Sequence, residues 1–209
     1  AKQCQERMLL GKAFPIAEDL KQKLENSEKF DEVTIVGSYR RRRPTVGDID
    51  ILATADEPRE AMKEFISDDD VKRVLVEGET KSSIIISGDL QVDLRIVDEK
   101  SYGAAKQYFT GSKDHNVTVR TIATRKDWKL NEYGLFDSED NRLEGETEEA
   151  VYSKLQMEYI EPELREDTGE VEAAQNGELP DLVEEEDVKG DLQMHTDYSD
   201  GNDSIQDMA

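Results

Sequence analysis

The sequence predicts an α+β fold, with a small mixed sheet and flanking helices followed by a mainly helical segment. Two observations predict it. Short β-rich runs recur between residues 33 and 97, and apolar residues then recur at helical spacing from Tyr102 onward. A chain of 209 residues has room for one sizeable core or two small ones. No apolar run in it approaches the roughly 18 residues that a membrane span needs.

The first half alternates helices and strands. A helix is expected over 8–24, where Gly11 and Pro15 should break or kink it, and a second over 57–66, opened by Pro58. Five β-rich runs predict strands at 33–36, 48–53, 71–76, 83–86 and 90–97, the last preceded by a turn at Gly88-Asp89. The mixture favours a sheet with helices packed around it.

The second half is mainly helical. Helices are expected over 104–109, 117–122 and 146–155, with a short strand or turn at 131–136. Residues 161–190 are acidic, poor in aromatic side chains and weakly periodic, which predicts a solvated linker. An acidic partner-binding segment is the alternative interpretation of that stretch.

Charge is unevenly distributed along the chain. The formal net charge is -23, of which residues 161–209 supply -15 from 17 acidic and two basic residues. The total argues against nucleic-acid binding, which usually relies on cationic surface. The cations of residues 1–160, however, gather in Arg40–Arg43 and in the predicted helix that carries Lys113, Arg120, Arg125 and Lys126. Any DNA contact should therefore be local and sensitive to salt.

Cysteine and histidine usage excludes two classes of site. The single cysteine, Cys4, excludes an internal disulfide framework and suits a reducing compartment, so we expect a cytoplasmic protein. One cysteine and two histidines, His115 and His195, cannot complete a zinc site of the Cys/His type within this chain.

Three aspartates on two predicted strands carry the chemical signal. Asp48 and Asp50 alternate with Ile49 and so share one strand face, and Asp93 lies on a matching alternating strand. If these strands pair, three carboxylates line one wall, where their repulsion calls for a cation such as Mg²⁺. The alternative for an isolated Asp-x-Asp is a solvated strand face. The third aspartate favours a catalytic metal site, in which divalent ions would activate an attacking oxygen and stabilise a leaving one.

A phosphate-binding turn is predicted just before the aspartates. The strand ending at Gly37-Ser38 leads into Arg40–Arg43, and backbone N–H groups, a hydroxyl and guanidinium groups all suit an anion. The alternative for four consecutive arginines is a basic tag or a solvated patch. Their position between the Gly-Ser turn and Asp48 favours phosphate binding.

These motifs together resemble a known family. Gly-Ser-x-Arg-Arg followed by Asp-Ile-Asp is similar to the signature of the nucleotidyltransferase superfamily, and Tyr108-Phe109-Thr110-Gly111-Ser112, with Asn116 and Arg120 beyond it, resembles family X DNA polymerases. The resemblance runs from about Met8 to Glu161 and includes the closing Tyr159-Ile160-Glu161-Pro162. It implies a nucleotidyltransferase-type palm over 1–100 and a thumb over 101–160.

The resemblance also implies roles for individual residues. Asp48, Asp50 and Asp93 would be catalytic and would hold two Mg²⁺ ions, for which Mn²⁺ can substitute. The groups expected to bind the incoming nucleotide are Gly37, Ser38, Arg41, Gly47, Tyr108, Phe109, Gly111 and Asn116. Arg120 would contact the template strand. Plainer alternatives exist for four of these: core packing for Tyr108 and Phe109, a helix N-cap for Asn116, and a surface position for Arg120.

A second resemblance covers the end of the chain. Residues 190–201, Gly-Asp-Leu-Gln-Met-His-Thr-Asp-Tyr-Ser-Asp-Gly, are similar to the opening motif of the PHP phosphoesterase domain that follows the polymerase in prokaryotic relatives. This implies an acidic linker at 161–190 and an N-terminal PHP stub at 191–209. Gln193 stands where many PHP domains have a histidine, and Gln91 where the beta-type enzyme has an arginine. No lyase region precedes Ala1, so we expect a catalytic fragment.

The sequence thus predicts a template-directed DNA polymerase core that adds dNTPs to a primer 3′-hydroxyl, in gap-filling repair. Its expected partners are primer-template or gapped DNA and dNTP, with no membrane, and it is expected to act as a monomer. Two alternatives remain: a template-independent nucleotidyltransferase, and an inactive fragment that binds nucleotide or DNA without turnover.

Overall fold

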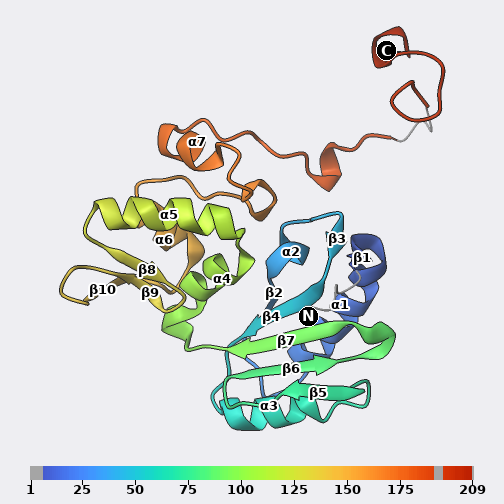
Figure 1. Ribbon diagram of the computed structural model, residues 1–209. Coiled ribbons are helices and arrows are strands. Elements are labelled where there is room, and N and C mark those ends of the chain that lie inside the picture. Colours follow the sequence, from blue (N-terminus) through green and yellow to red (C-terminus); the bar gives the residue numbers. More distant parts are fainter. Residues whose placement is uncertain (1–6, 191–194, 209) are drawn as a thin grey trace, which may run out of the picture. The chain divides into compact units, whose positions relative to one another are not determined.

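A five-stranded mixed sheet forms the centre of the first half of the chain, in the order β2-β4-β7-β6-β5 (Figure 1). The computed structural model describes residues 7–190 and 195–208. Strands β4 and β7 pair in parallel, and the other neighbours are antiparallel. The strands are β2 (Val33–Ile35), β4 (Asp48–Ala53), β5 (Arg73–Val76), β6 (Lys81–Ile85) and β7 (Gln91–Ile96). The predicted α+β class is confirmed.

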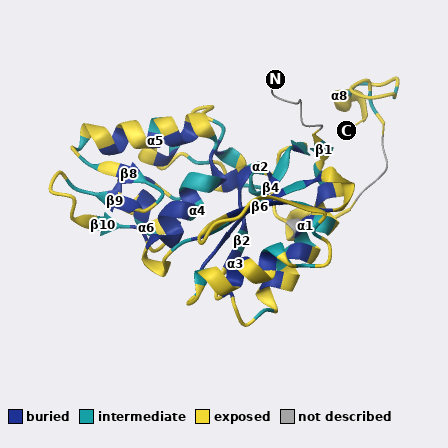
Figure 2. Ribbon diagram, turned by 60° about the horizontal axis from the view of Figure 1, so that its bottom comes forward, coloured by how far each residue is buried: buried dark blue, intermediate teal, exposed yellow. Residues whose placement is uncertain are grey.

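One face of this sheet and its helices build the first core. Ile49, Ile51, Val92 and Leu94 alternate with polar residues along β4 and β7 and are at most 1% exposed. Two helices contribute their buried faces to the same core, α1 (Leu10–Glu25) and α3 (Pro58–Ile66) (Figure 2). Three shorter elements complete this part: β1 (Met8–Leu9), α2 (Gly37–Arg40) and β3 (Thr45–Val46).

The break expected in the first helix does not occur. Helix α1 runs continuously from Leu10 to Glu25 and includes Pro15. An interior proline costs a helix about 3 kcal/mol. Four small or aliphatic residues on one face of α1 are buried against the sheet: Ala13, Ala17, Leu20 and Leu24. This tertiary burial outweighs the local penalty, since packing of one apolar face supplies most of a helix's stability in a protein.

A second core holds the helical part together. Its elements are α4 (Tyr102–Thr110), α5 (Lys113–Arg125), α6 (Glu148–Lys154) and a three-stranded antiparallel sheet of β8 (Lys129–Asn131), β9 (Gly134–Phe136) and β10 (Arg142–Glu144). Only part of this sheet was expected, as a strand or turn at 131–136. Short 3₁₀ turns lie at η1 (Ser87–Asp89), η2 (Glu99–Ser101) and η3 (Pro162–Leu164).

The predicted linker boundary at residue 161 is wrong. The first compact unit extends to Leu179, and residues 161–179 contain η3 and helix α7 (Glu170–Asn176). Val171 and Ala174 join the second core, and Arg165 is fully buried. Acidic composition misleads here because Glu170 is buried against His115, so its charge is not a sign of solvation.

Residues 180–209 form the second compact unit, with η4 (Glu185–Asp187) and α8 (Ile205–Met208) among its described residues. His195 Nδ1 lies 2.6 Å from Asp200 Oδ1. The expected PHP stub falls on this unit, but residues 191–194, including Gln193, lie outside the described residues. Among the helices that the structure describes, none has the length and apolar character needed to span a membrane.

Candidate active site

The three predicted aspartates lie on the two central parallel strands. Asp50 on β4 is the register partner of Asp93 on β7, and Asp48 is the partner of Gln91. Neighbouring strands are about 4.8 Å apart, and alternate residues along a strand share a face. All three side chains are half-buried, whereas Ile49 and Val92 beside them point into the core. Strand pairing therefore places the carboxylates on one wall, as the alternation predicts.

The electrostatics of this wall favour an added cation. Burial, together with the charges of Asp48 and Asp93, raises the pKa of Asp50 to about 7. Burial and the charge of Asp93 also raise the pKa of Asp48 above its ordinary value. Carboxylates that raise one another's pKa in this way hold charge that a bound cation would stabilise.

Two neighbouring residues, Gly37 and Gln91, lie directly against carboxylates of this wall. Gly37 has φ +66°, and a Cβ at this position would lie 2.4 Å from Asp50 Oδ2, so only glycine lets the backbone approach so closely. Gln91 donates a hydrogen bond from Nε2 to Asp93 Oδ1, 2.8 Å away. The residue that departs from the beta-type pattern thus contacts a predicted catalytic carboxylate directly.

The donor set fits a hard divalent cation. Within residues 7–190 and 195–208, no three His, Cys, Asp or Glu side chains are grouped closely enough to form a metal-binding cage. Mg²⁺ is ordinarily bound through one or two carboxylates, water and substrate phosphates rather than by such a cage. The register pair Asp50 and Asp93, with Asp48 on the same face, supplies that kind of oxygen donor.

The arginine run is only partly a solvated patch. Arg40 and Arg41 are half-buried, while Arg42 and Arg43 are exposed. Arg40 donates from Nη1 to Thr110 Oγ1 at 2.7 Å, and both of its Nη atoms donate to Glu148, at 2.9 and 2.6 Å. Arg41 donates from Nε to Glu166 at 2.7 Å and from Nη1 to the carbonyl oxygen of Thr110. The run therefore joins the first core to the second.

The turn Thr110-Gly111-Ser112 begins at the last residue of α4. Tyr108 and Phe109 are half-buried and meet edge to face with ring centroids 5.0 Å apart, and Arg95 lies 4.5 Å over the Phe109 ring. Gly111 has φ +72°, and a Cβ there would lie 3.1 Å from Nη1 of Arg41. The left-handed backbone at position 111 therefore favours glycine, and a side chain there would also crowd the Arg41 guanidinium.

Asn116 and Arg120 lie on α5. Ser112, not Asn116, is the N-cap, and its hydroxyl accepts from the N–H of His115 at 3.2 Å. The buried Asn116 amide donates to the carbonyl of Tyr108 and accepts from Gln107, both at 2.7 Å. Arg120 is exposed. Of the remaining predicted residues, Ser38 follows Gly37 in α2, and Gly47 lies between β3 and β4.

Sequence reasoning missed a buried ion network between the two cores. Glu148, only 2% exposed, accepts from Arg40 and from Arg165 Nη1 at 2.6 Å, and Arg165 also donates to the carbonyl of Ile160. Burial alone would raise the pKa of Glu148, but bonding to Arg40 and the charges of Arg40 and Arg165 outweigh it and hold the pKa low. The sequence does contain one sign of this network. Arg165 is the only basic residue between 161 and 188, in an otherwise acidic segment.

Comparison with known proteins decides the family. Residues 13–132 match the DNA polymerase beta palm, and residues 105–166 match the DNA polymerase beta thumb. The chain belongs to family X of the DNA polymerases. It is 35% identical over 207 residues to the DNA polymerase/3'-5' exonuclease PolX of Bacillus subtilis (strain 168), covering 98% of this chain and 36% of that relative. It thus spans about a third of that relative's length.

Other family X proteins give the same assignment. Repair DNA polymerase X of African swine fever virus (isolate Tick/Malawi/Lil 20-1/1983) is 30% identical over 143 residues, covering 64% of this chain and 80% of that relative. The crystal structure of Leishmania infantum polymerase beta in a ternary P/T complex has a TM-score of 0.64 and 26% identity, covering 77% of each chain. Its ternary gap complex has the same TM-score, with 25% identity and coverage of 77% and 71%.

These findings confirm the resemblance drawn from the Gly-Ser, Asp-Ile-Asp and Tyr-Phe-Thr-Gly-Ser motifs. The family X fold accounts for the mixed sheet with flanking helices and for the helical part that follows it. DNA polymerases of this family are metal-dependent in general, in keeping with the carboxylate wall on β4 and β7.

Proposed function

We propose that this chain is the catalytic core of a template-directed repair polymerase, which adds dNTPs to a primer 3′-hydroxyl in gapped DNA. The observation that carries the proposal is the register pairing of Asp50 with Asp93, beside the close approach of Gly37. These residues lie within the segment 13–132 that matches the DNA polymerase beta palm. The relatives that the chain resembles are named repair polymerase or polymerase X.

The protein's own groups would orient the reactants. Asp48, Asp50 and Asp93 would hold two Mg²⁺ ions, or Mn²⁺ in their place. Such ions supply activation of the attacking hydroxyl and stabilisation of the leaving pyrophosphate. The turn at Gly37 and Ser38, with Gly47 and the Arg41 guanidinium, would receive the triphosphate. Gln91 would keep the Asp93 carboxylate in place through its 2.8 Å hydrogen bond.

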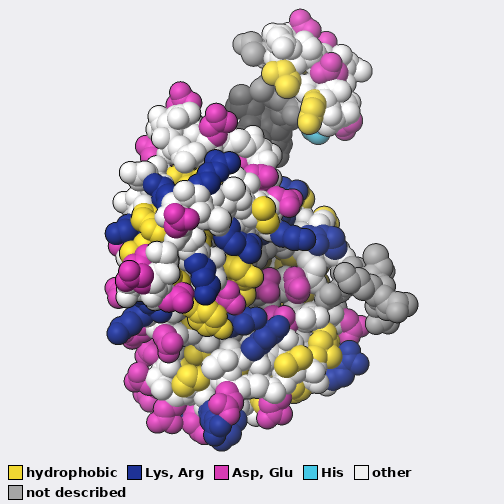
Figure 3. Space-filling model, turned by 60° about the vertical axis from the view of Figure 1, so that its left-hand side comes forward, with side chains coloured by type: hydrophobic (Ala, Val, Ile, Leu, Met, Phe, Trp, Pro, Cys, Tyr) yellow, Lys and Arg dark blue, Asp and Glu magenta, His cyan; other side chains and the backbone are white. Residues whose placement is uncertain are grey.

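The thumb would sense the base and the template. Tyr108, Phe109 and Gly111 would lie beside the sugar, Asn116 would exchange its internal bonds to reach the base edge, and exposed Arg120 would contact the template strand. Figure 3 shows acidic and basic side chains interspersed over one face of the molecule. Affinity for DNA would therefore come from local phosphate contacts and would weaken steeply with salt.

We place the palm at 1–100 and begin the thumb at 101. We extend the thumb from the predicted end at 160 to residue 179, and the packing of η3 and α7 on the same core as α5 and α6 supports this extension. Residues 191–209 would begin a PHP domain, and the core would act as a monomer.

Gap filling tests the proposal. The chain is incubated with a one-nucleotide gapped duplex and each dNTP in turn, with and without Mg²⁺. Incorporation of the complementary dNTP alone supports a templated polymerase. Incorporation that ignores the template would support a template-independent nucleotidyltransferase, and dNTP binding without turnover would identify an inactive fragment.

A further inference from the structure

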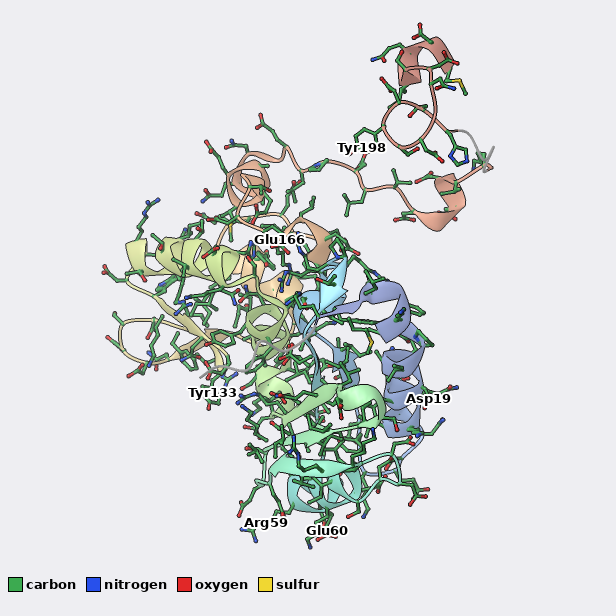
Figure 4. The ribbon with its side chains drawn as sticks, turned by 45° about the vertical axis from the view of Figure 1, so that its right-hand side comes forward. Asp19, Arg59, Glu60, Tyr133, Glu166 and Tyr198 are labelled. Carbon is green, nitrogen blue, oxygen red and sulfur yellow. The ribbon has the colours of Figure 1, made fainter. Side chains whose placement is uncertain are left out.

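Glu166 makes a contact that the function above leaves unexplained. Its Oε1 accepts from Nε of Arg41 at 2.7 Å and lies 3.7 Å from Nε of Arg43. Figure 4 labels Glu166 in the loop after η3, in the segment that composition alone predicts to be solvated linker. The side chains of Arg41 and Glu166 are 14% and 24% exposed, so water only partly screens the pair.

The loop that presents Glu166 is anchored at the preceding residue, Arg165, through both its backbone and its side chain. The N–H of Ser112 donates to the carbonyl of Arg165 at 3.0 Å, which ties the loop to the Thr110-Gly111-Ser112 turn. The Arg165 side chain is fully buried and bonded to Glu148 and to the carbonyl of Ile160. The Glu166 carboxylate is therefore a fixed hydrogen-bond acceptor, because the residue before it cannot move freely.

The two contacts of Arg41 leave donors for a phosphate. A guanidinium has five N–H donors. Nε of Arg41 donates to Glu166 and one N–H of Nη1 to the carbonyl of Thr110. The hydrogen bonds formed within the described residues leave Nη2 and the second N–H of Nη1 able to donate to phosphate oxygens. Arg41 and Arg43 share the single carboxylate of Glu166, so these three side chains together carry a net positive charge.

We propose that Glu166 is a positioning residue for the incoming triphosphate. It holds the Arg41 guanidinium against Thr110 and directs the remaining N–H groups to the phosphates. The inference rests on the proposed function, since it takes Arg41 as a phosphate ligand. Preorganisation lowers the ordering cost of binding a long side chain, so its loss should weaken phosphate binding about three- to tenfold.

The test compares Glu166→Ala and Glu166→Gln with wild type in the full 209-residue chain. Calorimetry measures binding of inorganic tripolyphosphate and of dNTP with Mg²⁺ present, and single-gap filling gives KM for dNTP and kcat. We expect Glu166→Ala to weaken tripolyphosphate binding and raise KM by the same factor, with kcat little changed. Glu166→Gln keeps an oxygen acceptor and should show a smaller effect. Thermal unfolding of both variants verifies the fold.

Two comparisons test whether Glu166 affects tripolyphosphate binding through Arg41. Glu163→Ala is the matched control, because Glu163 pairs with exposed Arg42 at 3.7 Å, and it should leave tripolyphosphate affinity unchanged. In an Arg41→Ala background, Glu166→Ala should add nothing, since its action passes through Arg41. Unchanged or tighter tripolyphosphate binding by Glu166→Ala overturns the inference, and tighter binding would identify the carboxylate as a competitor of phosphate. Failure of wild type to copy the template overturns the proposed function instead, and the calorimetry decides the inference independently.

Discussion

Replacing Glu148 with alanine should destabilise the fold strongly. Glu148 is 2% exposed and accepts three charge-assisted hydrogen bonds, two from Arg40 and one from Arg165, at 2.6 to 2.9 Å. Removing one partner from a buried ion pair typically costs about 3–5 kcal/mol, because the remaining charge stays buried. Arg165 is fully buried, and its Nη2 has no hydrogen-bond partner in the described part of the chain. Most of the lost stability should therefore come from leaving the Arg165 guanidinium buried without its carboxylate partner.

Urea unfolding followed by circular dichroism measures this cost. A loss of about 3–5 kcal/mol would remove at least about a fifth of the roughly 5–15 kcal/mol by which a typical domain is stable. Glu149→Ala is the control on the same helix, since Glu149 is exposed, and it should change stability by less than about 0.5 kcal/mol. Adding Arg165→Met to Glu148→Ala should restore part of the loss by removing the unpaired charge.

The pH dependence of stability, compared between wild type and Glu148→Gln, gives an independent check. The pKa of Glu148 is held low in the folded state, so its stabilisation is present at neutral pH and is lost as pH falls through that lowered value. The difference in the free energy of unfolding between wild type and Glu148→Gln should therefore become smaller at acid pH. A loss below about 1 kcal/mol for Glu148→Ala, or a difference that becomes larger at acid pH, would refute the buried-pair reasoning.

Three further predictions concern the carboxylate wall. Burial and the charges of Asp48 and Asp93 raise the pKa of Asp50 from 3.8 to about 7, so in metal-free buffer the folded state should lose stability as pH rises between these two values. Asp50→Asn should abolish this decline in urea unfolding. Gly37→Ala should cost about 1–2 kcal/mol from its left-handed backbone and displace the Asp50 carboxylate, measured as lost stability together with lost incorporation. Gln91→Ala should lower kcat about 10–100-fold without changing the melting temperature, as expected when a ligating carboxylate loses its hydrogen-bond partner; an unchanged kcat would remove Gln91 from the site.

Local patterns were enough to predict the elements that carry the aspartates. Alternation of Asp48 and Asp50 with buried isoleucines predicts strand 48–53, which is the observed extent of β4. The same period in 90–97 predicts β7 and the face on which Asp93 lies. Because a strand's alternation fixes which side chains share a face, only the pairing of β4 with β7 had to be supplied by the fold.

Contacts between distant segments could not be predicted in the same way. No local pattern tells which carboxylate meets Arg40 or Arg41, and their partners, Glu148 and Glu166, are more than a hundred residues away. The acidic composition of 161–179 even points away from a packed segment, because a buried glutamate with a partner has the same sequence signature as a solvated one. Burial of Arg165 and of Glu170 depends on partners that only the tertiary structure provides.

Template-dependent incorporation distinguishes a DNA polymerase core from a fragment that only binds nucleotide or DNA. Wild type and Asp93→Ala are compared on a single-nucleotide gapped duplex with each dNTP in turn and Mg²⁺, with thermal unfolding to verify that both are folded. We expect wild type to incorporate only the complementary dNTP, and Asp93→Ala to be folded but to incorporate none. Substantial Mg²⁺-dependent extension by Asp93→Ala, or incorporation by wild type regardless of the template base, would contradict this expectation.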